Sequence, residues 1–566
     1  MGIVTKIKEE LSEESLFKVV QILIGTFAVE LLLAALLFLV GSGITWHFFF
    51  VSFAITVIIV SVINKQRVSE IEIVLALAII VFFTWLSGEV FDGSWDGNAY
   101  HKLAIGLLKN HWNPIHSLPD LALTEGAGVV SFGQTLWVEA YCKVTWIFGA
   151  SLYAVTGNIE TGKSYTLIAM TCAFLLVFYY MRKKGHNALR AVLMACIAAF
   201  NPISMMQMTS FYIDGFLHTM LIILVVSLLM LEDKETFNVK TSVCMIAMSM
   251  IVCGNIKFTG LLYGGLFCIA YYVYDCVRLI RNDEKWKNKV FKETFLYACL
   301  VFVTVVWAGS SAYMTNLIRH GSLTYPLTGE GKVDIMTGNS PFTEENHFKN
   351  LFLSLFSRVD NFTVASGGAP ELKVPFTFNK DEVSMMVLTD PRISGFGVMF
   401  GGLFIVAIIG LIVCFVLGDN KKLKIMAGLN LGVCGALMFG IKESWWARYS
   451  PYIYFIVLAA VYMTFCSKRK NIMIFAALYC AILMFNNCLP LIYFKQGFDD
   501  AKAIEEVFVD LKDAGMIEIC NSNFEGVYYN FKDYGVRYRV NNELINEQGL
   551  NTTNYEGTVW RMYQNQ

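Results

Sequence analysis

The amino-acid sequence predicts an all-α polytopic membrane protein with about thirteen transmembrane helices. Of its 566 residues, 56% are hydrophobic and only 16% are charged, and the mean hydropathy is +0.54. An ordinary soluble domain is far less apolar. In addition, apolar runs of roughly 20 residues, the length that crosses a bilayer core, recur along the chain. The membrane is therefore the expected solvent for most of this protein.

The apolar runs set the positions of the predicted helices. We expect them over residues 17–40, 46–64, 71–91, 160–181, 188–203, 214–231, 241–256, 258–277, 292–312, 396–417, 424–441, 450–466 and 472–493. Cytoplasmic loops are enriched in Lys and Arg, and alternate connections carry such residues, among them Lys65, Arg182, Lys285, Lys421, Lys468 and Arg469. This pattern predicts a cytoplasmic amino terminus and an extracytoplasmic carboxy terminus. We expect the membrane to be a bacterial plasma membrane.

The long connections between helices all fall on the predicted outer side. The sequence divides into a membrane module, 1–493, with outer connections at 92–159 and 313–395, and a small C-terminal segment, 494–566. Tyr100, Leu103, Leu107 and Leu108 fall at helical spacing, which predicts an amphipathic helix lying in the membrane interface. The tail predicts a small α/β unit, with a helix over 499–514 and strands over 516–520, 536–540 and 558–563.

Composition also excludes several classes of function. The net charge is −1 and no basic stripe is present, so nucleic-acid binding is not expected and membrane lipids are the expected partners. Residues 157–164 match the P-loop pattern G-x-x-x-x-G-K-S. A P-loop needs a preceding strand in a soluble α/β sheet, whereas this stretch connects two apolar helices, so we interpret the match as accidental.

An acidic motif follows the third predicted helix. Asp92 and Asp96 lie four residues apart in Phe-Asp-Gly-Ser-Trp-Asp-Gly-Asn-Ala-Tyr-His, which ends at His101. In one interpretation Asp96 or Asn98 caps the next helix and Asp92 only ends the previous one. In the other, a carboxylate at the membrane surface is a general base that takes a proton from an acceptor hydroxyl.

Further ionisable residues are predicted at the same outer level. Asp214 begins the sixth helix, Lys257 lies between the seventh and eighth, and Arg448 and Tyr449 lie between the eleventh and twelfth. Long basic side chains at helix ends can extend to lipid headgroups. Ionisable groups near membrane depth are costly, however, and usually face a bundle interior or a watery cavity. Their common level predicts a site.

The order and sidedness of these motifs resemble the GT-C superfamily, the polytopic glycosyltransferases that include protein O-mannosyltransferases and the lipid A aminoarabinose transferase. The resemblance covers residues 70–490 and rests on the acidic loop at Asp96, a second acidic position at Asp214, a Lys-x-x-Gly turn at Lys257 and a basic-aromatic-Pro motif at Arg448. In this chain three predicted helices precede the acidic loop, where one is usual.

The resemblance implies roles for these residues. Asp96 would be the catalytic base, and Lys257, Arg448 and Tyr449 would bind the donor phosphate. A second acidic site for the acceptor or a metal would comprise Asp92, Asp214 and His101. A divalent cation, Mg²⁺ or Mn²⁺, is an optional cofactor because hard cations favour carboxylates.

The implied reaction is the inverting transfer of a sugar from a polyprenyl-phosphate donor to a lipid, glycan or protein acceptor at the extracytoplasmic face. The connection 313–395 is long enough to be a lid over that site. Two alternatives stay open: a polysaccharide polymerase or ligase that uses lipid-linked donors, and a transporter or flippase of lipid-linked substrates. A transporter would be expected to hold its charged residues near the bilayer midplane.

Overall fold

The computed structural model describes residues 12–119, 134–334, 338–343, 346–467, 470–520, 524–541, 543–544, 551–552 and 559–562. Three parts of the sequence predictions lie outside these ranges: most of the amino-terminal segment, the basic residues Lys468 and Arg469, and the ends of the third predicted strand.

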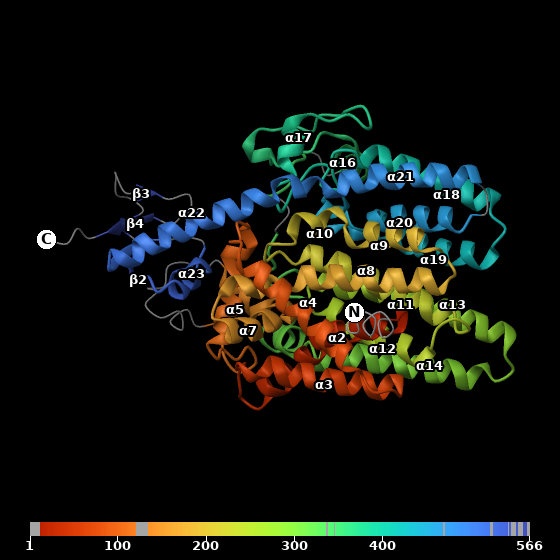
Figure 1. Cartoon of the computed structure of the whole chain (residues 1–566), viewed down its shortest axis with the longest axis horizontal. Helices are drawn as coiled ribbons and strands as arrows, with labels where there is room; N and C mark the ends of the chain where they lie inside the picture. The colour runs from red at the N-terminus through yellow and green to blue at the C-terminus, as the bar shows by residue number, and fades with distance from the viewer. Residues whose placement is uncertain are drawn as a thin grey trace, which may run out of the picture.

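The chain folds into a bundle of helices that run largely along its long axis (Figure 1). The helices of the bundle are α2 (Glu13–Leu39), α3 (His47–Asn64), α4 (Glu70–Gly88), α8 (Tyr165–Lys183), α9 (Ala188–Ala199), α11 (Asp214–Glu232), α12 (Val239–Gly254), α13 (Phe258–Asn282), α14 (Trp286–Val301), α18 (Phe400–Leu417), α19 (Lys421–Gly440), α20 (Pro451–Phe465) and α21 (Lys470–Cys488).

Short helices and single turns connect them. These are η1 (Gly97–His101), α5 (Lys102–Lys109), α6 (Thr135–Ala140), α7 (Val144–Thr156), η3 (Ile159–Lys163), α10 (Pro202–Gln207), η4 (Phe302–Trp307), η5 (Ser310–Met314), α15 (Thr315–His320), α16 (His347–Phe356), η6 (Val364–Ser366), α17 (Lys380–Met385), η7 (Lys442–Trp445), η8 (Ala447–Tyr449) and η9 (Leu489–Tyr493).

Among the described residues, ten helices are long and apolar enough to cross a membrane. Each corresponds to one of the roughly thirteen spans predicted from apolar run length. The other three predicted spans form α9, α12 and α20, which have 12, 16 and 15 residues. At about 1.5 Å per residue such helices are shorter than a bilayer core of about 30 Å. The predicted count of about thirteen full-length spans is therefore not confirmed within the described ranges.

Apolar side chains cover the outside of the bundle. Phe291 on α14, Val62 on α3 and Val416 on α18 are each at least 70% exposed. Burying such large hydrophobic groups stabilises a fold in water, so an outer surface of this kind fits a lipid environment. By contrast, 89% of the most apolar stretch of α11 is buried, which places this helix at the centre of the bundle. The chain is an integral membrane protein.

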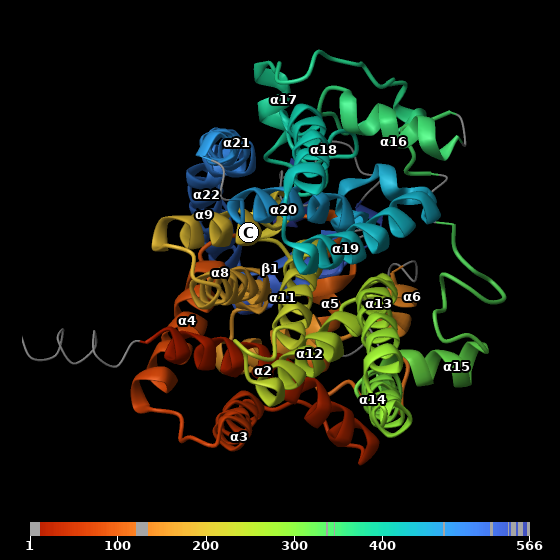
Figure 2. The same ribbon diagram turned by 90° about the vertical axis from the view of Figure 1, so that its right-hand side faces the viewer.

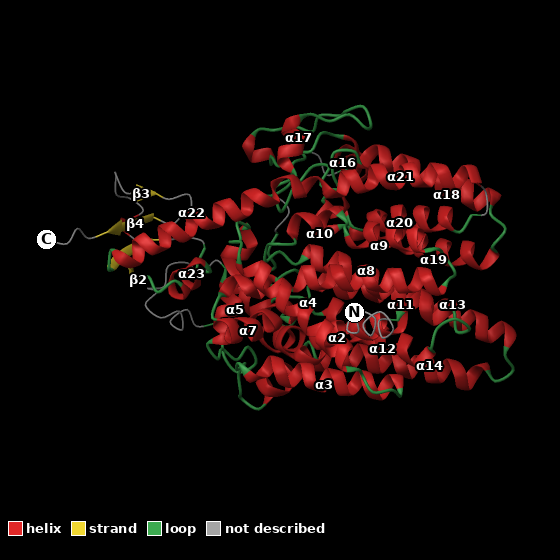
Figure 3. Cartoon of the chain, in the orientation of Figure 1, coloured by secondary structure: helices red, strands yellow, loops and turns green. Residues whose placement is uncertain are grey.

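The two ends of the bundle differ in character. The α13–α14 and α18–α19 connections, which carry Lys285 and Lys421, lie at one end (Figure 1), and Figure 2 views the bundle from that end. The C-terminal segment lies at the opposite end, which also holds the only strands among the described residues (Figure 3).

The C-terminal segment is a mixed sheet packed against helices. Helix α22 (Phe494–Asp513) continues from α21 through η9 and begins five residues before the predicted helix. The elements after α22 are β1 (Met516–Cys520), α23 (Val527–Asp533), β2 (Arg537–Val540), β3 (Asn551–Thr552) and β4 (Val559–Met562). The sheet has the order β2-β1-β4-β3; β1 pairs in parallel with β2 and antiparallel with β4. The hydrophobic core of the segment includes Phe508, Ile517, Ile519 and Phe531.

Candidate functional site

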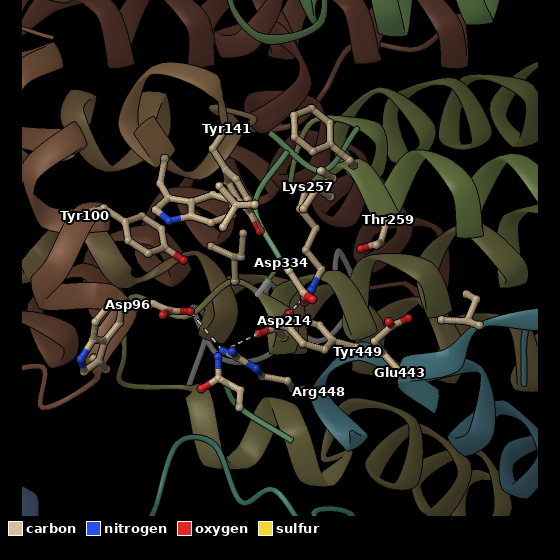
Figure 4. Close-up of a pocket in the computed structure, with 18 of the residues that line it drawn as sticks. Asp96, Tyr100, Tyr141, Asp214, Lys257, Thr259, Asp334, Glu443, Arg448 and Tyr449 are labelled. Atoms are coloured by element: carbon tan, nitrogen blue, oxygen red, sulfur yellow. Dashed lines mark hydrogen bonds and ion pairs between the residues drawn. The ribbon is translucent and has the colours of Figure 1, made fainter. Parts of the chain in front are cut away.

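A cavity of about 580 Å³ lies where several helices of the membrane module begin. Five of the site residues that the sequence predicts line it together, although they come from four separate parts of the chain (Figure 4). They are Asp96, Asp214, Lys257, Arg448 and Tyr449.

Asp96 lies in the connection that follows α4, directly before η1. Its backbone is already helical and its side chain makes no capping hydrogen bond, so the interpretation of Asp96 as a helix cap is wrong. Instead, Arg448 Nη1 donates to Asp96 Oδ2 at 3.1 Å. Gly97 is needed here because an added Cβ would lie 1.8 Å from Asp92 Oδ2. The tight turn leaves the Asp96 side chain facing the cavity.

Asp214 and Lys257 form a buried ion pair on the opposite wall. Asp214 is the first residue of α11, and Lys257 is the extended residue that precedes α13. Lys257 donates to Asp214 Oδ1, and both side chains are only 4% exposed. An added Cβ at Gly260 would lie 2.1 Å from the carbonyl oxygen of Cys253. The Lys-x-x-Gly turn thus allows α13 to start directly against the end of α12.

Arg448 joins the two walls. It lies in η8, and its Nη1 is 3.1 Å from Asp96 Oδ2 and 3.7 Å from Asp214 Oδ2. Its Nε is 3.3 Å from Oδ1 of Asp390, which in turn accepts a hydrogen bond from Trp446 Nε1 at 2.7 Å. Three carboxylates therefore surround one guanidinium, and Lys257 is the second cation of the group.

Aromatic rings fix the two cations in place. The guanidinium of Arg448 lies 4.6–5.0 Å from the ring centroids of Tyr212, Trp446 and Tyr449. Lys257 Nζ lies 4.4 Å from the centroid of Tyr449, so this ring touches both cations. Stacking of this kind suits Arg in particular, because its planar guanidinium is weakly hydrated.

Burial makes the carboxylates of Asp96 and Asp390 more basic. Desolvation raises the pKa of Asp96, opposed by Arg448 and reinforced by the charge of Asp214. The pKa of Asp390 is raised for the same main reason. A raised pKa strengthens a carboxylate as a base, provided that it remains ionised at the working pH.

Two predicted site residues are not among those that line the cavity. The Asp92 carboxylate accepts from the Ser94 backbone and, at 2.7 Å, from its hydroxyl, and so closes a turn. His101 is buried, and its Nδ1 accepts from Trp146 Nε1 at 2.7 Å. Burial lowers the pKa of His101 to about 3, so the imidazole is neutral at physiological pH. Among the described residues, neither makes a hydrogen bond or ion pair with Asp214.

The carboxylates do not present a metal site. Asp96 and Asp214 face cations, and Asp92 is committed to its own turn. Within the part of the chain that the structure describes, no group of three or more His, Cys, Asp or Glu side chains is arranged to hold a metal ion. An optional Mg²⁺ or Mn²⁺ that bridges a carboxylate to phosphate stays a prediction.

Other lining residues were not predicted as functional. Trp95, Tyr100, Trp137 and Tyr141 form an aromatic wall, and Lys332, Asp334 and Asn339 reach the cavity from the connection 313–395. The sequence predicts that this connection covers the site, so lining residues such as Lys332, Asp334 and Asn339 could be expected from it. Asp390 carries no local signal, because only the fold brings it to Arg448.

The sequence matches no known family model, and no curated protein sequence is similar to it at a significant level. One solved structure that is similar is ArnT from Cupriavidus metallidurans bound to undecaprenyl phosphate. The identity is 12%, the match covers 81% of this chain and 84% of that chain, and the TM-score is 0.33. A similarity at this level carries no functional assignment, which has to come from the cavity itself.

Proposed function

We propose that this protein transfers a sugar from a polyprenyl-phosphate donor to an acceptor hydroxyl at the extracytoplasmic membrane surface. One observation carries the proposal. A carboxylate, Asp96, and two cations, Arg448 and Lys257, line a single aromatic-walled cavity at helix ends of a membrane bundle. A general base and an anion-binding pair are the two groups that this reaction needs.

The proposed reaction is a single displacement at the anomeric carbon. The acceptor hydroxyl gives its proton to Asp96, and its oxygen forms the new bond to the anomeric carbon. The bond from that carbon to the phosphate oxygen breaks, and the electron pair leaves with the polyprenyl phosphate. In-line attack inverts the configuration. A phosphate is a good leaving group, so no general acid is required.

Arg448 and Lys257 would stabilise the charge that develops on the leaving phosphate. A guanidinium can bind two phosphate oxygens at once, and charge-assisted hydrogen bonds are the strong ones. Arg448 Nη1 also donates to Asp96. A phosphate bound to Arg448 would compete with that carboxylate and release it, so donor binding would make Asp96 a freer base.

The aromatic wall suits a sugar. Trp95, Tyr100, Trp137 and Tyr141 offer ring faces against which the apolar faces of a pyranose can pack, and the tyrosine hydroxyls offer hydrogen bonds. The residues from the connection 313–395 lie on the same cavity, and this connection is long enough to shield the reacting atoms from water.

The location of the charged residues favours an enzyme over a transporter. Asp96 follows α4, Asp214 begins α11, Lys257 precedes α13 and Arg448 precedes α20. All four therefore lie at helix ends, whereas transporter sites form near the bilayer midplane, often in broken helices. A polymerase or ligase would use the same donor class and differs only in its acceptor.

Purified protein in lipid nanodiscs tests the proposal. Undecaprenyl phosphate is titrated first, and binding is followed by the fluorescence of Trp95 and Trp137. Donors extracted as polyprenyl-phosphate sugars are then supplied with membrane extract as acceptor, and released polyprenyl phosphate is measured. We expect saturable phosphate binding and protein-dependent release. Binding of undecaprenol as tight as that of its phosphate would contradict the role of the two cations.

A further inference from the structure

The C-terminal segment lies directly against the loop that carries Asp96. The backbone N–H of Gly526 donates to the carbonyl oxygen of Asn98 at 3.0 Å. An added Cβ at Gly526 would lie 2.7 Å from that oxygen, so the two backbones are in close contact. Phe524 packs edge-on against Trp95, with ring centroids 5.9 Å apart. Trp95 is the residue directly before Asp96.

A buried polar network joins the same segment to the start of that loop. Asn530 on α23 accepts from Lys102 Nζ at 3.0 Å and donates to Glu160 Oε1 at 2.8 Å. Lys102 and Glu160 are also paired with each other at 2.6 Å, and both side chains are at most 1% exposed. A buried ion pair has to be completed by further hydrogen bonds, and Asn530 supplies two of them.

Glu160 connects this polar network to the turn around Asp96. Its Oε2 accepts from the backbone N–H of Asp92 at 3.1 Å. The Asp92 carboxylate then holds Ser94, and Ser94 Oγ accepts from the backbone N–H of Gly97 at 3.2 Å. Asp92, Ser94 and Gly97, which flank Asp96, are thus joined by a chain of contacts that leads back through Glu160 to Asn530.

A second anchor holds α23 in register. Asp533 accepts from the Tyr153 hydroxyl at 2.6 Å and from the backbone N–H of Ile159 at 2.7 Å. The Tyr529 ring lies over Gly106 of α5, where an added Cβ would lie 2.0 Å from the ring. Helix α23 is therefore seated between α5 and η3, beside Glu160.

We propose that residues 524–533 are a clamp that sets the geometry of the Asp96 loop, and that Asn530 is its central positioning residue, acting through Glu160 and Asp92. The inference rests on the proposed function only for its effect on turnover. In this proposal the C-terminal segment has a role in the site, although none of its described residues lines the cavity.

Hydrogen exchange in the full-length protein in nanodiscs tests the clamp without any substrate. The backbone N–H groups of Asp92, Ser94, Gly97 and Asn98 are all hydrogen-bonded within this network. Asn530→Leu keeps the branched shape of the side chain and its number of non-hydrogen atoms, and removes both hydrogen bonds. We expect roughly tenfold faster exchange at these four amides, because local opening becomes easier.

Two further variants make this test decisive. Gly526→Ala pushes on the Asn98 carbonyl and on Lys102 Cβ, each 2.7 Å from an added Cβ, without removing a hydrogen-bonding group of the polar network, and we expect it to accelerate exchange in the same peptide. It also decides the outcome if Asn530→Leu does not fold. Tyr534→Phe is the matched control: it removes the 2.8 Å hydrogen bond to Glu505 at the surface of the same segment and keeps the ring. Wild-type exchange in both Asn530→Leu and Gly526→Ala would overturn the clamp.

Turnover separates positioning from general destabilisation. A displaced Asp96 would lower kcat by about tenfold or more without weakening the binding of undecaprenyl phosphate, because Arg448 and Lys257 stay in place and Asp96 competes with the phosphate for Arg448. Faster exchange with unchanged kcat would overturn the positioning role. Faster exchange in a protein whose wild type releases no polyprenyl phosphate would leave the clamp standing and refute the proposed function.

Discussion

Replacing Asp96 with Asn distinguishes a catalytic base from a residue that only accompanies Arg448. Asn has the same size and still offers an oxygen to Arg448 Nη1, which lies 3.1 Å from Asp96 Oδ2. It cannot accept a proton from the acceptor hydroxyl. We therefore expect kcat to fall by roughly 10²–10⁴-fold, the range for loss of a general base.

The same substitution should tighten the binding of the donor phosphate. Asn keeps a hydrogen bond to the charged guanidinium of Arg448 but loses the charge–charge attraction, which is worth up to about 1 kcal/mol for an ion pair near solvent. Asn would thus compete with the phosphate for Arg448 less strongly than Asp does, by up to about 1 kcal/mol. Since about 1.4 kcal/mol is a factor of ten, Kd for undecaprenyl phosphate should fall by up to about fivefold.

Titration of undecaprenyl phosphate and single-turnover release of polyprenyl phosphate measure the two effects separately. Asp390→Asn is the control, because Asp390 pairs with Arg448 Nε but is not among the described residues that line the cavity. It should keep kcat within about tenfold of wild type, since no proton passes through it.

The opposite pattern of turnover and binding would contradict the assignment of Asp96 as the base. If Asp96→Asn retained most of its turnover while binding of the phosphate weakened, Asp96 would be a structural partner of Arg448 and the base would be another group. Asp214 would then be tested next. If Asn at position 96, 214 or 390 left turnover intact in every case, the glycosyltransferase proposal would fail.

Three further predictions follow from the same geometry. Arg448→Ala and Lys257→Ala should each weaken binding of undecaprenyl phosphate by about 1.5–3 kcal/mol, or roughly 10–150-fold, measured by titration; wild-type affinity would assign that cation to another role. Because the base works ionised and burial raises the pKa of Asp96, kcat/KM should rise with pH along a limb centred above the ordinary value of 3.8, and pH-rate profiles of Asp96→Asn should lack this limb. Cysteines placed at Lys421 and Asp499 should be labelled by a membrane-impermeant maleimide from opposite sides, the first only after permeabilisation, because the basic connections are predicted to be cytoplasmic; labelling of both from one side would contradict the topology.

The positions of the helices could be predicted from the sequence alone, because within a bilayer the backbone can satisfy its hydrogen bonds only inside a helix or a closed barrel. Apolar runs therefore map onto helices such as α2, α11 and α18 with errors of a few residues. The sequence also placed Asp96, Asp214, Lys257 and Arg448 at helix ends, since an ionisable group interrupts an apolar run.

Which of these helix ends lie together could be seen only in the tertiary structure. The hydrogen bond between Arg448 and Asp96 joins residues 352 positions apart, and no local periodicity encodes such a contact. Asp92 and Asp96 look equivalent in the sequence, yet the turn closed by Ser94 directs only one of them to the cavity. The lengths of α9, α12 and α20 depended likewise on packing, because their ends are set by neighbouring turns and not by hydropathy. Side-chain direction and long-range pairing follow from the packed bundle, and that is why the site became visible only in the fold.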